Sequence, residues 1–326
     1  MIQLFKATPT GEEIAALKEV LDSGWWAMGS KVKEFEEAFA VSVGAKYAVA
    51  TNSCTAALDI AVRVTPLPDV VSVSAFTFVA SADCVLRAGK KIRFVDIDEE
   101  SYCTPQADIQ VFYGGNHSGE GIIYDMAHSG GSTHHGVVSC WSFHAVKNLP
   151  TGDGGMLTTN DPDIYRRAKA LSWCGIDKST YERSGKTYSW EYNIQEVGMK
   201  ANMNDLTAAI GLCQLKKLPE NNAYRAQLAA WYDTYLPESI KRPFRSQTWH
   251  LYPIRVQNRN EVYEKLAAQG ITCGVHYKPL TFYPIFPQTK LPVTERVYSE
   301  ILSLPMHLQL TEEDVKTVCN ALSFLV

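Results

Sequence analysis

The chain has 326 residues, of which 46% are hydrophobic and 20% charged, and its formal net charge is −4. This length suits one large core with a smaller domain beside it, and the balanced charge gives no electrostatic reason to expect binding to nucleic acid or to a membrane surface. No apolar run approaches the ~20 residues that span a bilayer, and no basic and apolar leader begins the sequence, so we expect a cytoplasmic protein.

The eight cysteines are scattered, with no CxxC pair and no spacing typical of zinc or iron–sulfur sites. We expect reduced and mostly buried thiols. Five of the eight histidines fall between residues 117 and 144, but no two have the i, i+4 spacing of a metal pair on one helix face. The sequence therefore predicts no metal site.

Helices and strands follow one another through the first part of the chain. Thr10 and Glu13 form a capping-box pattern that predicts a helix from residue 11 to residue 23, and helical spacing of apolar residues predicts another up to Gly44. Further helices are expected after residue 53, from about 76 to 89, and over 164–173. Strands are expected over 46–51, 69–74, 92–97, 108–113, 122–124 and 137–143.

An anion site is indicated where the strand 46–51 passes through a small polar turn into a helix. Ser53, Cys54 and Thr55 begin that helix. Free N–H groups and the helix dipole at such a terminus attract negative charge. An ordinary helix N-cap is the alternative.

Two strands, 122–124 and 137–143, end in polar side chains. Asp125 follows the first, and Ser142 and then Lys147 close the second. Ligands sit at the carboxyl ends of strands in open α/β sheets, and desolvation there lowers the pKa of a lysine and favours a nucleophilic amine. Pyridoxal phosphate needs an amine, a carboxylate for its ring nitrogen and donors for its phosphate, which these three residues can supply. A lysine on a solvated loop is the alternative.

The segments YDMAHS and CWSFHAVKNLPTGDGGMLTTND resemble the active-site region of the DegT–StrS family of sugar aminotransferases, and the similarity extends from about Trp25 to near the C-terminus. Those proteins are pyridoxal-phosphate enzymes of fold type I, so the resemblance implies an α/β large domain with a mostly parallel sheet. It implies that Lys147 holds the cofactor aldehyde, that Asp125 pairs with the ring nitrogen, that His128 lies near the ring and that the Ser142 hydroxyl meets the phosphate.

The resemblance implies further cofactor contacts. It assigns Ser53, Cys54 and Thr55 to the phosphate, although the family usually has glycine where this chain has Cys54. Phe78 matches a residue that stacks on the cofactor ring. Asn202 matches one that reaches the cofactor phosphate of the other subunit, so a homodimer with shared active sites is expected.

Four residues are weaker candidates for substrate contacts. Trp26 lies in an aromatic segment that relatives have near the substrate, and packing is the alternative. Lys200 precedes Asn202, and a solvated lysine is as good an interpretation. His276 and Tyr277 lie in a segment that matches the family, where a purely structural role is the alternative.

The region 101–136 is shorter than the resemblance leads us to expect. Only residues 114–120 separate the predicted strand 108–113 from the one that ends at Asp125. A parallel connection needs a dozen or more residues, usually with a helix, so we expect this chain to have lost that helix.

The C-terminal third is predicted as a small α+β domain, 221–326, beside a large domain, 1–220. A helix over 206–218 is expected to close the large domain after a long loop, 184–195. Strands over 249–256 and 271–277 and helices over 261–269 and 312–325 are expected in the small one.

The expected reaction moves an amino group from an amino acid, glutamate in our prediction, to a keto sugar carried on a nucleotide. A pyridoxal-phosphate-dependent sugar dehydratase is the alternative within enzymes; relatives of that kind either replace the lysine by histidine or need clustered cysteines, and this chain does neither. A non-catalytic regulatory or binding protein that keeps the fold is the alternative from another class.

Overall fold

A seven-stranded sheet forms the centre of the molecule. The computed structural model describes residues 1–184, 190–240, 242 and 244–325. The strands lie in the order β1-β7-β6-β5-β4-β2-β3. Only β7 runs antiparallel to its neighbours, and the other pairs are parallel, which confirms the predicted α/β class. The strands are β1 (Tyr47–Thr51), β2 (Val70–Ser74), β3 (Lys91–Val95), β4 (Ile109–Val111), β5 (Ile123–Asp125), β6 (Val138–Ser142) and β7 (Gly155–Thr159).

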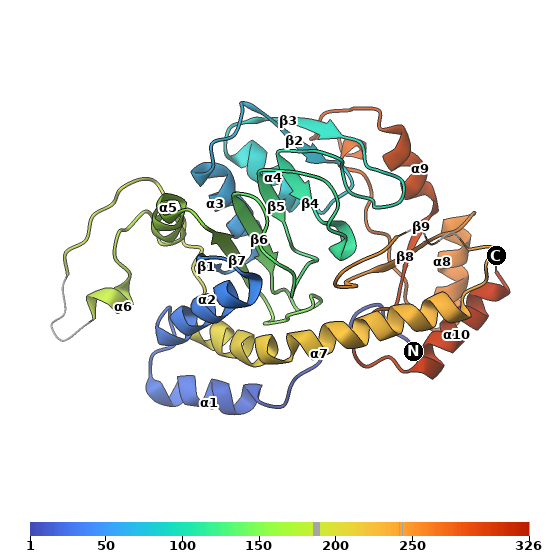
Figure 1. Ribbon diagram of the computed structural model, residues 1–326, viewed down its shortest axis with the longest axis horizontal. Coiled ribbons are helices and arrows are strands. Elements are labelled where there is room, and N and C mark those ends of the chain that lie inside the picture. Colours follow the sequence, from blue (N-terminus) through green and yellow to red (C-terminus); the bar gives the residue numbers. More distant parts are fainter. Residues whose placement is uncertain (185–189, 241, 243, 326) are drawn as a thin grey trace.

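Helices cover both faces of this sheet (Figure 1). Helices α3 (Cys54–Val64), α4 (Ala80–Arg87) and α5 (Pro162–Ser172) pack with the sheet in one buried cluster. On the other face α2 (Ser30–Val43) and α7 (Asp205–Tyr235) enclose a second cluster, and α1 (Glu13–Ser23) packs along α7. Alternate residues of one strand enter opposite clusters, as Ile123 and Tyr124 of β5 do, because successive strand side chains point to opposite faces.

Helix α7 is longer than the predicted 206–218. It continues through Pro219 to Tyr235. The prediction ended at the residue before a proline, because a proline lacks the N–H that would continue the helix. Buried residues on both sides of Pro219, Leu218 before it and Leu228 and Tyr232 after it, keep the helix packed along its whole length. The predicted domain division between residues 220 and 221 falls inside α7 and stays a prediction.

The β4–β5 connection lacks an α-helix, as predicted from its length. One 3-10 turn, η1 (Tyr113–Gly115), follows β4, and β5 then pairs parallel with β4. The backbone turns at Gly114 and Gly115, whose φ angles are 59° and 90°. Glycine adopts such angles without the steric cost that other residues have.

The C-terminal part carries its own buried cluster together with the end of α7. Strands β8 and β9 pair antiparallel there. The predicted strand 271–277 is wrong: this segment makes single bridges, Ile2 with Ile271 and Gly274 with Ser303, before it turns towards the sheet. Strands β7 and β9 and helix α9 were not predicted. The elements are β8 (Tyr252–Arg255), α8 (Arg259–Ala268), η2 (Leu280–Phe282), α9 (Pro292–Glu300), β9 (Ile301–Leu304) and α10 (Glu312–Ser323).

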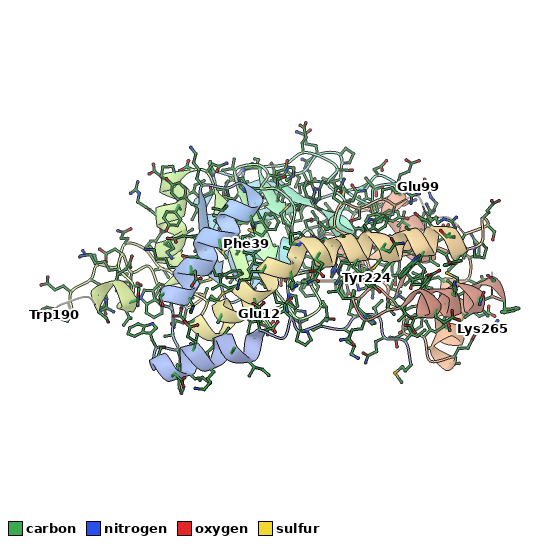
Figure 2. The ribbon with its side chains drawn as sticks, turned by 60° about the horizontal axis from the view of Figure 1, so that its bottom comes forward. Glu12, Phe39, Glu99, Trp190, Tyr224 and Lys265 are labelled. Carbon is green, nitrogen blue, oxygen red and sulfur yellow. The ribbon has the colours of Figure 1, made fainter. Side chains whose placement is uncertain are left out.

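A long segment between α5 and α7 leaves the body of the molecule and carries the short helix α6 (Thr180–Arg183) (Figure 1). Residues 185–189 of the predicted loop lie outside the described residues. Figure 2 shows Trp190 of this segment at one end of the molecule and Lys265 of α8 at the other. Seven of the eight cysteines are buried thiols and Cys174 is exposed. Within the described ranges, no helix has the length and apolarity to cross a membrane.

Candidate active site

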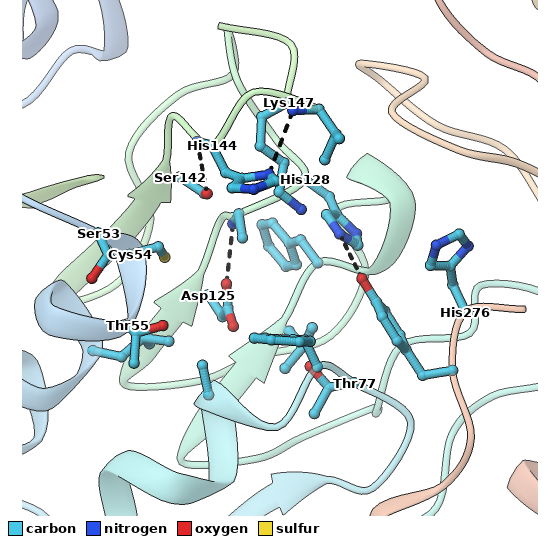
Figure 3. A pocket seen from close by; sticks show the side chains of 18 of the residues that line it. Ser53, Cys54, Thr55, Thr77, Asp125, His128, Ser142, His144, Lys147 and His276 are labelled. Atoms are coloured by element: carbon cyan, nitrogen blue, oxygen red, sulfur yellow. Dashed lines mark hydrogen bonds between the residues drawn. The ribbon is translucent and has the colours of Figure 1, made fainter. Parts of the chain in front are cut away.

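A cavity of about 440 Å³ opens at the carboxyl ends of β5 and β6, beside the first turn of α3 (Figure 3). Strand β7 starts at this edge because it runs antiparallel to β6. Seven separate segments of the chain meet here, and ten predicted site residues line the cavity. They are Ser53, Cys54, Thr55, Phe78, Asp125, His128, Ser142, Lys147, His276 and Tyr277.

Asp125 is the last residue of β5, and its carboxylate is held from two sides. One oxygen accepts the Ser81 hydroxyl at 2.7 Å, and the other accepts the Ala127 N–H at 3.0 Å. Burial raises the pKa of Asp125, and the hydrogen bonds with Ser81 and Ala127 and the charge of Lys147 partly offset that rise. The carboxylate is thus fixed in position with its charge incompletely balanced, which suits a partner for a cationic ring nitrogen.

Ser81 was not predicted as a site residue. It lies in the first turn of α4, and its hydroxyl is also 2.9 Å from that of Thr77. A serine near the start of a helix reads as an ordinary capping residue in the sequence. Only the fold brings it against a carboxylate that lies 44 residues further along the chain.

Lys147 projects into the cavity from the turn that follows β6 (Figure 3). Its backbone N–H donates to the His144 carbonyl at 2.8 Å, and the Ser142 hydroxyl accepts the His144 N–H at 3.4 Å. Burial lowers the pKa of the Lys147 amine to about 8, against the opposing effects of Asp125 and Cys54. A much larger fraction of this amine is neutral near pH 7 than of an exposed lysine, which makes it a better nucleophile.

The first turn of α3 can accept an anion. The Ser53 hydroxyl caps the helix, since its oxygen accepts the Ala56 N–H at 3.2 Å. No acceptor among the described residues takes the N–H groups of Cys54 and Thr55. Gly155 passes so close that a Cβ on it would lie 2.4 Å from the Cys54 nitrogen. A glycine at this point keeps the space in front of the helix terminus open.

The resemblance leads us to expect glycine at position 54, and the geometry of Cys54 explains why a side chain is tolerated there. It is the first residue of α3, so its backbone does not need the conformations reserved for glycine. Burial raises the pKa of its thiol well above the usual value. The thiol stays neutral and adds no negative charge beside a bound anion.

His128 and Tyr277 form a hydrogen-bonded pair on the wall of the cavity. His128 Nε2 lies 3.1 Å from the Tyr277 hydroxyl, and His128 Nδ1 accepts the Gly114 N–H at 3.0 Å. The His250 ring lies 4.3 Å from that of His128, measured between centroids. Phe78 stands nearby with 58% of its surface exposed, so one face of its ring is available to a ligand.

Three predicted residues lie outside this cavity within one chain. Asn202 pairs with Thr51 at the end of β1, and its side chain accepts from Lys200 Nζ at 3.0 Å. The Lys200 amine lies 3.6 Å above the Trp173 ring. Trp26 is 54% exposed and lines a separate hollow with Trp173. Lys200 thus links Asn202 to the hollow formed by Trp26 and Trp173.

Two histidines of the histidine-rich region, His117 and His135, pack against the ring of Phe112. His117 stacks on Phe112 with ring centroids 4.7 Å apart, and His135 meets Phe112 edge-on. Burial lowers the pKa of His117 to about 4. Among the described residues, no three histidine, cysteine or acidic side chains form a group suited to a metal ion.

Pyridoxal phosphate makes three chemical demands, and the cavity can meet each of them. The lysine suits the aldehyde, the carboxylate suits the ring nitrogen, and the open helix terminus suits the phosphate. The sheet order, with one antiparallel strand beside the site, is that of fold type I enzymes that use this cofactor. The sequence model of the DegT/DnrJ/EryC1/StrS aminotransferase family matches residues 8–112 and 116–323. The chain belongs to that family, and its cofactor is pyridoxal phosphate.

Several relatives match the chain over nearly its whole length. The spore coat polysaccharide biosynthesis protein SpsC of Bacillus subtilis is 34% identical over 368 aligned positions, covering 97% of this chain and 94% of SpsC. PseC of Helicobacter pylori, an aminotransferase involved in the biosynthesis of pseudoaminic acid, superposes with a TM-score of 0.90 at 25% identity, covering 99% and 98% of the two chains. The pyridoxal-phosphate form of Spr1654 from Streptococcus pneumoniae, designated a sugar aminotransferase, gives 0.86 at 26% identity, covering 100% and 99%.

The comparisons also show a gap in the family match and a difference in length. The family match is interrupted at residues 113–115, which form the turn η1. The alignment with SpsC, at 368 positions, is longer than the chain, at 326 residues, so SpsC carries residues that this chain lacks.

Proposed function

We propose that this enzyme moves an amino group from glutamate to a keto sugar carried on a nucleotide. The observation that carries the proposal is that the amine of Lys147 and the carboxylate of Asp125 line the same cavity, with pKa values shifted towards each other. The association of SpsC with polysaccharide biosynthesis and the designation of Spr1654 support a sugar as the acceptor. We further propose that the reaction takes place in the cytoplasm.

Each residue of the cavity has a separate task. When bound, pyridoxal phosphate supplies an aldehyde and a ring that accepts electrons. The Lys147 amine would hold the cofactor through its aldehyde and, once freed by the amino donor, would carry a proton from the carbon that bears the donor's nitrogen to the carbon attached to the cofactor ring. Asp125 keeps a proton on the ring nitrogen. The first turn of α3 and the Ser142 hydroxyl bind the phosphate.

We also propose a homodimer in which each cavity is completed by the partner chain. Lys147 is the only lysine or arginine among the described residues that line the cavity, so the carboxylate of an amino-acid donor finds no arginine there. Asn202, assigned to the phosphate of the other subunit, lies outside its own cavity. The segment around α6 exposes apolar side chains that a partner would cover: Trp190, Ile194 and Val197 are 73%, 68% and 86% exposed.

The test is a panel of nucleotide-linked keto sugars with glutamate as donor, read out as 2-oxoglutarate and as amino sugar by mass. Amino-sugar formation from one member, abolished in Lys147→Ala, supports the proposal. A product that has lost water and gained no nitrogen identifies a dehydratase instead. Transfer from another amino acid but not from glutamate rejects the donor, and transfer to keto acids alone rejects the sugar.

A further inference from the structure

The turn η1 donates hydrogen bonds to His128 and to the residue directly before Tyr277. The Tyr113 hydroxyl donates to the His276 carbonyl at 2.6 Å, directly before Tyr277 in the chain. The Gly114 N–H donates to His128 Nδ1 at 3.0 Å, and both groups are buried. The His128 ring in turn meets the Tyr277 hydroxyl through its Nε2 atom, at 3.1 Å. The turn η1 therefore sets the positions of both the His128 ring and the Tyr277 hydroxyl.

The bond from Gly114 determines which nitrogen of His128 carries a proton. A backbone N–H can only donate, so His128 Nδ1 must present its lone pair. Burial, followed by the charge of Lys147 and the influence of His276, holds the pKa of His128 well below its usual value, so the ring is neutral. A neutral imidazole has one N–H, which must then be at Nε2.

The direction of the next hydrogen bond follows. His128 Nε2–H donates to the Tyr277 oxygen across 3.1 Å, so the proton of the Tyr277 hydroxyl points elsewhere. Burial raises the pKa of this hydroxyl, with a further rise from Asp125, so the proton stays on it. No other partner of that hydroxyl occurs in the described part of the chain, and Tyr277 lines the cavity. The free proton is therefore available to a ligand.

We infer that the turn Tyr113–Gly115 is a positioning device that fixes His128 as the Nε2–H tautomer and thereby makes Tyr277 a hydrogen-bond donor to an acceptor oxygen of the ligand in the cavity. That oxygen belongs either to the cofactor or to the substrate. The inference goes beyond the proposed function, which gives no role to residues 113–115 and no direction to the Tyr277 hydroxyl.

The packing around the turn shows that it can hold this geometry. The Gly114 carbonyl accepts the Ser246 hydroxyl at 3.0 Å and the His250 N–H at 3.2 Å, so Gly114 is held at its carbonyl as well as at its N–H. A Cβ at Gly114 would lie 2.7 Å from the Phe244 ring, and one at Gly115 would lie 2.0 Å from the Thr248 hydroxyl. Residues 113–115 are also the ones that the family match leaves out.

The first test is nitrogen NMR of the full-length, cofactor-free protein labelled with ¹⁵N at histidine. The His128 signals are identified by their loss in His128→Gln. We expect an unprotonated Nδ1 and a protonated Nε2 across neutral pH. A protonated Nδ1, or a ring with two protons, overturns the inference whatever the enzyme's reaction proves to be.

The second test uses three hydroxyl deletions: Tyr277→Phe, Tyr113→Phe and, as a matched control, Tyr232→Phe. Tyr232 is also buried, and its hydroxyl donates to the Pro305 carbonyl at 2.9 Å, away from the cavity. We expect Tyr277→Phe either to weaken the affinity for pyridoxal phosphate or to raise the KM for the sugar. The expected change is about tenfold, because one hydrogen bond is lost. The first result assigns the oxygen to the cofactor and the second to the substrate.

The Tyr113→Phe and Tyr277→Phe variants form a double-mutant cycle. The cycle distinguishes a loss of Tyr277 positioning from a general loss of protein stability. Tyr113→Phe should show a smaller loss of the same kind, which disappears when Tyr277→Phe is already present. Tyr232→Phe should leave both binding constants unchanged. Equal effects of Tyr113→Phe and Tyr232→Phe, full additivity of the two active-site changes, or unchanged binding in Tyr277→Phe each overturn the inference.

Discussion

Asp125 and Lys147 line one cavity, and each favours the charged form of the other while burial disfavours both charges. The Lys147 charge lowers the pKa of Asp125, the Asp125 charge raises that of Lys147, and in each residue burial is the larger effect. The Lys147 ammonium therefore gives up its proton more readily than that of an exposed lysine. The Asp125 carboxyl keeps its proton more readily than an exposed carboxyl does.

Reduction with borohydride should attach the cofactor irreversibly to Lys147. The amine that lines the cavity, with its pKa lowered to about 8, is the favoured nucleophile for the aldehyde. Peptide mass spectrometry after reduction should show the adduct on the peptide that contains Lys147, and Lys147→Ala should show none. An adduct on another lysine, such as Lys200, would refute the assignment.

Asp125→Asn should bind the cofactor and lose most of the amino transfer. A neutral amide keeps the shape of the side chain and its acceptor for the Ser81 hydroxyl, but it cannot hold a proton on the ring nitrogen. We expect kcat to fall roughly a hundredfold or more, as on removal of one preorganised electrostatic partner. Near-normal turnover would mean that Asp125 does not pair with the ring.

The rate at which cofactor-free protein captures pyridoxal phosphate should rise with pH and level off above about pH 8, because only the neutral amine attacks and burial lowers the Lys147 pKa to about 8. The Asp125 charge favours the protonated amine, so Asp125→Asn should lower that pKa further and move the midpoint to lower pH. Stopped-flow absorbance follows the capture, and ionisations of the cofactor are common to both proteins. A midpoint near the 10.5 of an ordinary lysine, or a shift to higher pH in the variant, contradicts this account.

Gly155→Ala should weaken cofactor binding by at least about tenfold, because its Cβ would lie 2.4 Å from the Cys54 nitrogen and push the first turn of α3 out of place. Gly130→Ala is the matched control, since a Cβ there meets its nearest neighbour at 3.3 Å and its backbone has no positive φ. Fluorescence titration with pyridoxal phosphate measures both. Similar losses in the two variants would remove the phosphate site from this turn.

Lys147→Ala and Asn202→Ala should complement each other when unfolded, mixed and refolded together. If Asn202 serves the partner's cavity, a mixed dimer has one site with both lesions and one with neither, so random pairing restores about a quarter of the sites. Lys147→Ala mixed with Asp125→Asn is the control, because these residues line the same cavity and every mixed site keeps one lesion. Recovery in the control alone, or a fully active monomer in sedimentation, rules out the shared site.

The sequence was sufficient to place Asp125 and Lys147 at one site because both lie close to strand ends. Asp125 ends β5, Lys147 lies in the turn after β6, and the parallel pairing of these two strands brings both residues to one edge of the sheet. Resemblance added residues from other segments, Phe78, His276 and Tyr277, and the fold brings them to the same cavity. The loss of a helix between β4 and β5 also followed from chain length alone.

What the sequence did not predict depends on contacts between distant segments. Strand β7 begins in a glycine-rich run that reads as a loop, and its pairing with β1 and β6 makes it a strand. In the sequence, Ser81 is an ordinary residue of a helix start and Gly114 an ordinary residue of a turn. Only the fold brings Ser81 against Asp125 and Gly114 against His128. Asn202 stays a prediction, since the chain that it is expected to serve is a second copy.

Helix α7 has a mechanical consequence. It packs against the sheet at its start and against the C-terminal cluster at its end, and the segment with Tyr277 that walls the cavity comes from that C-terminal part. A helix behaves as a stiff rod except where a backbone hydrogen bond is missing, and Pro219 supplies such a break near the middle. We therefore expect any rocking of the C-terminal part against the sheet to bend α7 at Pro219 and to change the width of the cavity mouth.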